Sequence, residues 1–341
     1  MNAFTRRQFL GTLAAAPLAS AVPAVWAQTA SLKISHQFPG GSVAEGDFRD
    51  RLCRMFAAET ERRTKGRVKF SIYPRSTLMK SEAQIPALAR GALDMSLVPL
   101  SYAGAELPEV NIGLMPGLVT SYEQGYAWKN EEIGREFNRI LADKGIVMLS
   151  WIWQAGGMAS RGKPIVDPED VAGLRVRGGS PEMDMILKQA GASVVSMPSN
   201  DIRGALEKGQ LDAAMTSSSS LISFRLDEVS KSVTTARGGA YWFMLEPLLM
   251  SRAAFERLPR DQQAVLLSVG ADLEAFARKS AQMDDAAVAA LFQGAGGRTA
   301  DLNADSLRKW QTLARETAWR DYGERNANCA KLLALAEKTV V

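Results

Sequence analysis

"LARGALDMSLV" occupies residues Leu88 to Val98, and "LEKGQLDAAMT" occupies Leu206 to Thr216. Both segments read Leu-x-x-Gly-x-Leu-Asp and continue into a short apolar run. The glycine predicts the end of a helix, because glycine tolerates the positive φ of that position. The apolar run predicts a buried strand. One helix-to-strand joint therefore occurs twice in this chain.

Similar elements precede the two joints. Strand candidates at 68–73 and 194–197 end at Pro74 and Pro198, and helix candidates at 81–90 and 201–208 follow. Further strands are predicted at 32–38, 147–152 and 174–176, with one long strand at 241–251, and further helices at 47–64, 123–144 and 181–190. This alternation predicts an α/β protein of two similar lobes, with mostly parallel sheets flanked by helices and a ligand cleft between the lobes.

The N-terminus reads as a targeting segment. Residues 1–27 contain Arg6-Arg7 before Phe9-Leu10, an apolar stretch, and small residues up to Ala27. We interpret them as a twin-arginine signal peptide cut after Ala27, which implies a periplasmic location. The alternative is an uncleaved anchor, although Pro17 and Pro23 interrupt the apolar stretch.

The composition excludes several classes of function. A chain of 341 residues with 46% hydrophobic and 23% charged residues has the composition of a globular protein of two domains. Two of its 41 basic residues fall in the predicted signal peptide. The other basic residues nearly balance the 37 acidic residues, so the mature chain carries little net charge. We found no basic run interleaved with aromatic residues, and we therefore expect no nucleic-acid partner.

Residues for catalysis or metal binding are few. His36 is the single histidine, and it is either a hydrogen-bonded structural residue or a base. Cys53 and Cys329 either form a disulfide or remain buried thiols. The chain lacks a phosphate loop, a Gly-x-Gly-x-x-Gly turn and a Gly-x-Ser-x-Gly elbow. We therefore expect no enzyme activity, no cofactor and no metal site.

A ligand site is predicted around "VAGLRVRGGSPEMD", Val171 to Asp184. Arg175 and Arg177 share one face of a strand, and Arg177 ends it, before Gly178 and Gly179. A guanidinium at the carboxyl end of a strand suits a ligand carboxylate, although an arginine on an edge strand can also be a plain surface residue. Strand ends and aromatic clustering add these candidates: Gln37, Tyr102, Trp153, Gln154, Thr216, Ser217, Tyr241 and Trp242. For each of these aromatic residues, the alternative to lining the ligand site is packing in the core. The run Ser217 to Ser220 is either a linker or a row of hydroxyl donors for the ligand.

The chain resembles the solute-binding proteins of tripartite ATP-independent periplasmic (TRAP) transporters, the DctP-like family. The resemblance spans the mature chain and rests on "VKFSIYPRSTL", "LARGALDM", "KPIVDPEDVAGLRVR", "SVVSMPSNDIRGALEKGQLDAAMT" and "RAAFERLPRDQQAVL". It implies two lobes joined by crossing strands, membrane permease subunits as partners, and a ligand carboxylate held by Arg177. It also divides the chain into lobe I (28–152 and 245–280), lobe II (153–244) and C-terminal helices spanning both (281–341).

Two departures from the family pattern bear on the ligand. Gly157 stands where sialate-type members have a second arginine, and Thr216 stands where many members have asparagine. We therefore expect a monomeric binding protein for a small organic acid anion, a monocarboxylate with a 2-oxo or 2-hydroxy group and an aromatic or short alkyl tail. The alternatives are a sugar acid as the ligand, or a receptor that feeds a sensor system.

Overall fold

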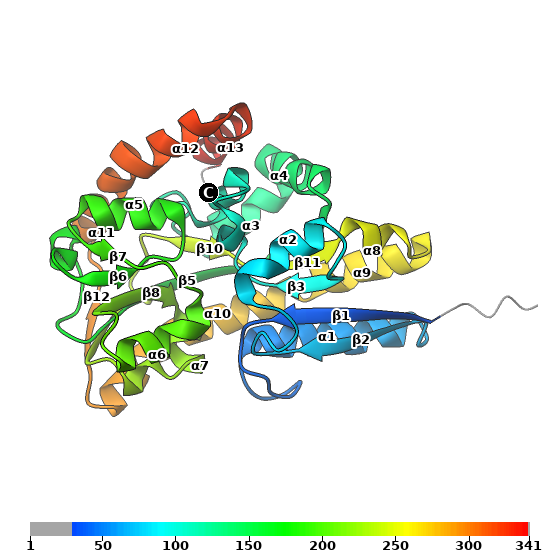
Figure 1. The fold of residues 1–341 in the computed structure, drawn as a ribbon, viewed down its shortest axis with the longest axis horizontal. Coiled ribbons are helices and arrows are strands. Elements are labelled where there is room, and N and C mark those ends of the chain that lie inside the picture. The colour runs from blue at the N-terminus through cyan, green and yellow to red at the C-terminus, as the bar shows by residue number, and fades with distance from the viewer. Residues whose placement is uncertain (1–28, 340–341) are drawn as a thin grey trace, which may run out of the picture.

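Two β-sheets flanked by helices form the fold of the computed structural model, which describes residues 29–339 (Figure 1). The predicted signal peptide of residues 1–27 lies outside the described residues. The first sheet has the strand order β2 (Val68–Tyr73), β1 (Ala30–His36), β3 (Met95–Leu97), β11 (Leu248–Ser251) and β4 (Ile146–Ser150). The second has the order β12 (Arg298–Asp301), β9 (Ser232–Thr235), β5 (Trp153–Ser160), β8 (Ala213–Ser217), β6 (Arg175–Arg177) and β7 (Ser193–Val194), with β10 (Phe243–Leu245) paired to β5.

Both sheets are mixed, whereas the sequence predicted mostly parallel ones. Strands β1, β2 and β3 are parallel, and so are β6, β7 and β8. Strand β11 runs antiparallel to β3 and β4, and β5 runs antiparallel to β8, β9 and β10. Strands β5 and β11 are the ones that the chain enters directly from the other sheet, so their direction follows from the crossing and not from a βαβ connection.

The repeated joint has the same structure in both lobes. Gly91 and Gly209 have φ of +73° and +67°, and the leucines that follow, Leu93 and Leu211, are buried. Asp94 accepts a hydrogen bond from the Lys33 backbone N–H on β1 at 3.0 Å. Asp212 accepts one from the Arg175 backbone N–H on β6 at 2.9 Å. Each aspartate therefore ties the start of its strand to the parallel neighbour, which explains why Gly-x-Leu-Asp occurs twice.

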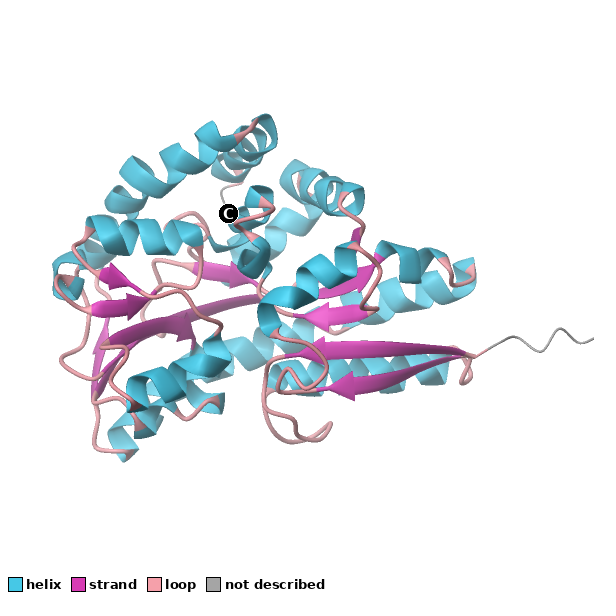
Figure 2. Ribbon diagram, viewed as in Figure 1, coloured by secondary structure: helices cyan, strands magenta, loops and turns pink. Residues whose placement is uncertain are grey.

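Helices cover both sheets (Figures 1 and 2). In lobe I, the half built on the first sheet, α1 (Phe48–Arg63) and α9 (Arg260–Asp272) pack together, and α2 (Gln84–Ala89), α4 (Glu132–Asp143) and α8 (Arg252–Glu256) also contact the strands. In lobe II, α6 (Ile202–Glu207) and α7 (Ser218–Ser223) share a core with β5, β8, β9 and α10 (Glu274–Gly294). Helices α5 (Pro181–Gln189) and α11 (Ala304–Ala314) lie across the sheet from α6 and α7.

The chain crosses between the lobes several times. Strand β4 leads through Trp151 and Ile152 into β5, β10 leads through Glu246 and Pro247 into β11, and α10 connects α9 to β12. Helices α12 (Arg320–Arg325) and α13 (Ala327–Lys338) then return over the top of the molecule in Figure 1, where α13 packs on α4. The segment predicted as C-terminal helices, 281–341, is not wholly helical, because it contains β12 at the edge of the second sheet. The residue boundaries given for the lobes stay a prediction.

Two predicted elements are interrupted in the structure. The long strand predicted at 241–251 is two strands, because Pro247 offers no N–H and the chain changes sheets at this point. The long helix predicted at 123–144 is α3 (Tyr122–Ala127), a short 3₁₀ turn and α4, with Glu131 in an extended conformation. This break allows the buried Trp128 to pack edge to face on Trp153, with ring centroids 5.1 Å apart.

The histidine and the cysteines have structural surroundings. His36 is buried and bonded through Nε2 to Asp50 Oδ1 at 3.1 Å. Cys53 and Cys329 are both free and buried, so the disulfide alternative is not realised in residues 29–339. Within that range, none of the helices combines the length and the hydropathy needed to cross a bilayer.

Candidate functional site

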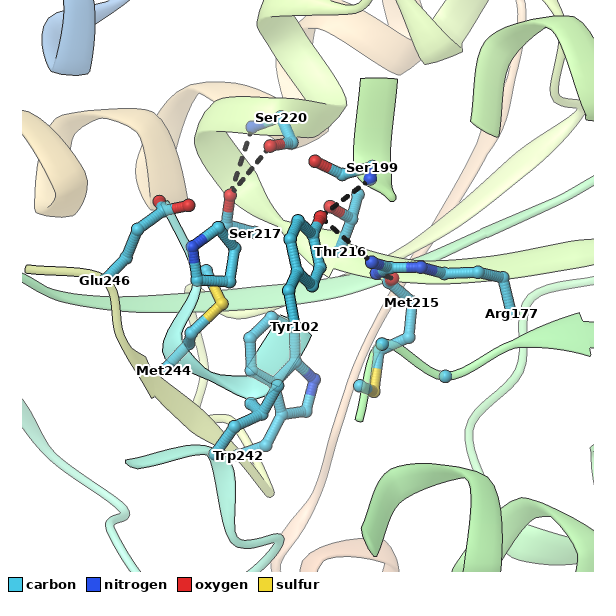
Figure 3. A pocket seen from close by; sticks show the side chains of 14 residues that line it. Tyr102, Arg177, Ser199, Met215, Thr216, Ser217, Ser220, Trp242, Met244 and Glu246 are labelled. Carbon is cyan, nitrogen blue, oxygen red and sulfur yellow. Dashed lines mark hydrogen bonds between the residues drawn. The ribbon is translucent and has the colours of Figure 1, made fainter. Parts of the chain in front are cut away.

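A narrow pocket lies where the two lobes meet (Figure 3). The cavity is small, about 20 Å³, well below the range of roughly 300–1,000 Å³ that is typical of small-molecule sites. Its lining comes from the ends of strands β6, β8 and β10, from the crossover before β11, and from turns of lobe I. The lining residues are Pro99, Tyr102, Leu114, Arg177, Gly178, Gly179, Ser199, Met215, Thr216, Ser217, Ser220, Trp242, Met244 and Glu246.

Arg177 supplies positive charge to the pocket. Its side chain is buried, and Nε donates to the Met197 carbonyl at 3.0 Å while Nη1 donates to the Met215 carbonyl at 2.8 Å. These bonds fix the plane of the guanidinium and use two of its five N–H groups. The remaining donors, on Nη1 and Nη2, are left for the pocket and for Tyr102, whose hydroxyl is 3.5 Å from Nη2. A carboxylate is the group that such a fork of donors fits best.

Gly179 allows the backbone to pass close to this arginine. Its φ is +106°, a conformation that side-chain-bearing residues rarely adopt. A Cβ at this position would lie 2.6 Å from Arg177 Nη1. A glycine is therefore required here for the guanidinium to keep its place.

Tyr102 joins the lobes across the pocket. It belongs to the 3₁₀ turn Leu100–Ala103, which follows β3 in lobe I. Its hydroxyl accepts a hydrogen bond from the Ser199 backbone N–H of lobe II at 2.8 Å (Figure 3). The same hydroxyl contacts the Gln37 side chain at 3.3 Å. Ser101 Oγ also donates to the Gly179 carbonyl at 3.0 Å. These bonds hold the lobes in contact, so the structure represents a closed arrangement.

The serine run is part of the pocket and not an exposed linker. Ser217 ends β8 and caps α7, where its Oγ accepts a hydrogen bond from the Ser220 backbone N–H at 3.3 Å. All four serines are buried, and Ser217 and Ser220 line the pocket beside Thr216. Polar side chains at the end of a strand thus face the same space as Arg177.

The side of the pocket opposite Arg177 contains residues that the sequence analysis missed. Glu246 is fully buried there, and it accepts hydrogen bonds from Arg49 Nη1 at 3.2 Å and from Gln154 Nε2. Burial raises the pKa of Glu246 to about 7, against the charge of Arg49. A carboxylate inside the apolar run "YWFMLEPLLMS" was the signal that could have identified it. Arg49 gave no such signal, since arginine near the start of a helix is ordinary.

The structure brings five of the nine predicted ligand-binding residues onto the pocket, namely Tyr102, Arg177, Thr216, Ser217 and Trp242. Gln37 and Gln154 lie behind it, in contact with Tyr102 and Glu246 respectively. The prediction that Trp153 and Tyr241 line the pocket is wrong. Trp153 packs in the core against Trp128, and the Tyr241 ring stacks on Trp310 at 4.5 Å. Direct contact of any of these residues with a ligand stays a prediction.

Gly157 lies in the middle of β5, between β8 and β9. A Cβ at this position would lie 1.7 Å from the Thr234 carbonyl oxygen. This backbone therefore leaves no room for an arginine side chain at position 157.

The pocket offers hydrogen bonding and charge for a small anion. Residues 29–339 contain no group of three His, Cys, Asp or Glu side chains arranged to hold a metal ion. The chemistry that the lining supports is recognition of a carboxylate at Arg177, with hydroxyl and carboxylate groups available for the rest of the ligand.

Comparisons with known proteins agree with this description. Residues 40–325 match the family model described as bacterial extracellular solute-binding protein, family 7. A solute-binding protein of Albidiferax ferrireducens is 61% identical over 338 residues, covering 98% of this chain and 99% of that protein. A TRAP periplasmic solute-binding protein of Rhodoferax ferrireducens, solved with bound malonate, is 63% identical with a TM-score of 0.89, and the match covers 90% of this chain and 98% of that one.

More distant solved structures share the fold. A TRAP periplasmic solute-binding protein of Chromohalobacter salexigens has a TM-score of 0.81 at 20% identity, over 91% of this chain and all of that one. The two-lobed α/β fold is thereby confirmed. The chain belongs to family 7 of the bacterial extracellular solute-binding proteins, and it is of the TRAP type.

Proposed function

We propose that this protein captures a short-chain monocarboxylate in the periplasm and delivers it to the membrane permease subunits of a TRAP transporter. The observation that carries the proposal is Arg177, a buried guanidinium held by two backbone carbonyls with its remaining donors facing the pocket. The Rhodoferax protein, 63% identical and solved with malonate, supports a small organic acid as the ligand class, although malonate is a dicarboxylate and does not support the restriction to one carboxylate.

The size and lining of the pocket support a short acid. The cavity between the closed lobes is only about 20 Å³, which favours a small acid over a large ring. Trp153 and Tyr241 lie elsewhere, so only Tyr102 and Trp242 offer aromatic surface for a ligand tail. The hydroxyls of Thr216 and Ser217 support a 2-oxo or 2-hydroxy group beside the carboxylate. Gly157, which leaves no room for a second arginine, supports one carboxylate over two.

A ligand screen by thermal shift and calorimetry tests the proposal. Acetate, propanoate, lactate and pyruvate are compared with malonate, succinate and D-glucuronate. A ligand present at a hundred times its Kd should stabilise the folded protein by about 2.7 kcal/mol. We expect lactate or pyruvate to give the largest shift. Absence of stabilisation by every acid at millimolar concentration would contradict the proposal, and preference for D-glucuronate would contradict its short-chain part.

The transport partner is tested separately. The permease subunits, reconstituted in liposomes with an ion gradient, should accumulate the acid only when this protein is added. A ligand-loaded protein that supports no uptake but activates a sensor kinase would favour the receptor alternative.

A further inference from the structure

Glu246 lines the pocket, and one of its two carboxylate oxygens has no hydrogen-bond partner among the described residues. Its Oε2 accepts hydrogen bonds from Arg49 Nη1 at 3.2 Å and from Gln154 Nε2. Its Oε1 is fully buried and has no hydrogen-bond partner among residues 29–339. A buried acceptor left unsatisfied costs roughly 1–3 kcal/mol, so a ligand that supplies a donor here gains over one that does not.

Arg49 does not neutralise Glu246 fully, because it is shared with a second carboxylate. Its Nε and Nη2 donate to the two oxygens of Asp47 at 2.9 and 2.6 Å. Only Nη1 reaches Glu246, and the same nitrogen also donates to Ser217 Oγ at 3.3 Å and to Ser220 Oγ at 3.1 Å. One guanidinium thus serves two carboxylates, which leaves net negative charge at this end of the pocket when Glu246 is ionised.

The two charged ends are separated by the width of the pocket. Figure 3 shows Arg177 and Glu246 on opposite sides, with Tyr102 and Ser217 between them. A ligand that spans the pocket therefore meets N–H donors at one end and a carboxylate acceptor at the other. A second ionised carboxylate placed against Glu246 would meet a like charge in a buried setting, which is unfavourable.

We propose that Glu246 is a specificity-determining residue that selects acids with a hydroxyl or amino donor at the end opposite their carboxylate and disfavours ionised dicarboxylates. The inference deepens the proposed function and rests on it, since it requires the ligand carboxylate to bind at Arg177. An ionised glutamate at this position only accepts hydrogen bonds, whereas a protonated one also donates through its O–H.

Protonation of Glu246 should relax the selection against dicarboxylates. Burial raises the pKa of its carboxyl group to about 7, so the group is largely ionised at about pH 8 and largely protonated at about pH 6. The charged or titratable groups facing it are Asp47 and Arg49 at the start of α1, Cys53 one turn further on, Asp284 of α10 beyond Arg49, and Arg177 across the pocket. A protonated Glu246 donates its O–H to a second carboxylate, and malonate should therefore bind more tightly as the pH falls.

Calorimetry of the full mature protein at about pH 8 tests the selection. Glycolate, 3-hydroxypropanoate and 4-hydroxybutanoate are paired with acetate, propanoate and butanoate, with β-alanine as the amino probe and malonate as the dicarboxylate. We expect the best hydroxy acid to bind at least about tenfold more tightly than its unsubstituted partner, since a hydrogen bond to a charged group is worth this much. Tighter binding of β-alanine than of 3-hydroxypropanoate would identify an ammonium as the donor.

Two substitutions separate charge from hydrogen bonding. Glu246→Gln keeps an acceptor and removes the charge, so malonate should gain about tenfold relative to propanoate and lose its pH dependence. Glu246→Leu removes the acceptor, so the preference for hydroxy acids should disappear. Glu182→Gln is the matched control, because Glu182 is another fully buried carboxylate and does not line the pocket. It should change the affinity of every acid by the same factor.

The outcomes distinguish the inference from the proposed function. Equal binding of hydroxy and unsubstituted acids by the wild type, or an unchanged ratio of malonate to propanoate in Glu246→Gln, would overturn the role of Glu246 alone. Failure of every acid to bind would overturn the proposed function and this inference with it.

Discussion

Two arginines two positions apart on one strand have different environments. Arg177 ends β6 inside the pocket, with its guanidinium fixed by the carbonyls of Met197 and Met215. Arg175 begins the same strand and forms an exposed ion pair with Asp212 at 2.7 Å. Strand alternation places both on one face, but only the carboxyl end of the strand reaches the junction of the lobes. Position along the strand therefore decides which arginine is available to a ligand.

Replacement of Arg177 should nearly abolish binding. Arg177→Ala leaves a buried carboxylate without its donors, which costs roughly 2–5 kcal/mol, or a loss of at least about thirtyfold in affinity. Arg177→Lys should also bind weakly, because an ammonium cannot reproduce two parallel N–H donors. Calorimetry with the tightest acid from the screen measures both variants. Arg175→Ala is the control and should bind like the wild type, and an Arg177→Ala variant within a few-fold of wild type would place the anchor elsewhere.

Introducing a side chain at Gly157 should destabilise the protein. Even the Cβ of Gly157→Ala would lie 1.7 Å from the Thr234 carbonyl, so β5 must move away from β9. We expect a loss of several kcal/mol, within the range of severe core substitutions. Gly204→Ala is the control, because the site in α6 is open, and alanine should stabilise the helix by up to about 1 kcal/mol. Chemical denaturation measures both, and a stable Gly157→Ala variant would show that the strand can yield.

At the scale of elements, three segments distant in sequence converge on one buried carboxylate. Glu182 of α5 accepts hydrogen bonds from Asn111 Nδ2, in the turn Pro108–Leu114 of lobe I, at 2.9 Å, and from Arg325 Nη1 of α12 at 2.7 Å. The contact links a helix of lobe II to lobe I and to the C-terminal segment. Burial is the largest influence on its pKa and raises it to about 7, although Arg325 opposes the shift.

This shift makes stability depend on pH. A carboxyl group whose pKa is higher in the folded than in the unfolded state stabilises the folded protein most at pH values below its unfolded-state pKa, which is near 4.5. This stabilisation is lost as the pH rises through the folded-state pKa of about 7. Glu182→Gln removes this group, so the stability of the wild type relative to the variant should fall between about pH 5 and pH 8, by about 2 kcal/mol. Urea denaturation across this range measures the difference. A constant difference would show that Glu182 stays ionised in the folded protein.

At the scale of the whole molecule, direct bonds between the lobes define a closed state. Tyr102 accepts from the Ser199 N–H, Ser101 donates to the Gly179 carbonyl, and Ser81 Oγ donates to Asn200 Oδ1 at 3.2 Å. The covalent connections are the crossings at Ile152 and Pro247 together with α10, and these can act as the hinge. Two-lobed binding proteins commonly close around the ligand in this way.

Ligand should therefore compact the protein in solution. Small-angle scattering is expected to give a smaller radius of gyration at saturating acid than in its absence, because the bound anion adds bonds that only the closed state provides. Tyr102→Phe removes a bond between the lobes and should weaken binding by roughly tenfold while favouring the open form. Identical profiles with and without ligand would indicate a pocket that is already closed.

The sequence alone determined the two joints at which a helix ends at a glycine and the chain continues through Leu-Asp into a strand. It also determined the two α/β lobes and the position of Arg177 at the end of a strand. These follow from short-range rules, since caps, alternation and strand ends are set by neighbouring residues. Only the tertiary structure decided that β5 and β11 run antiparallel, that Trp153 and Tyr241 lie outside the pocket lining, and that Arg49 and Glu246 meet at its far side. Such features depend on which distant segments pack together, and a buried tryptophan or glutamate has the same local pattern in either environment.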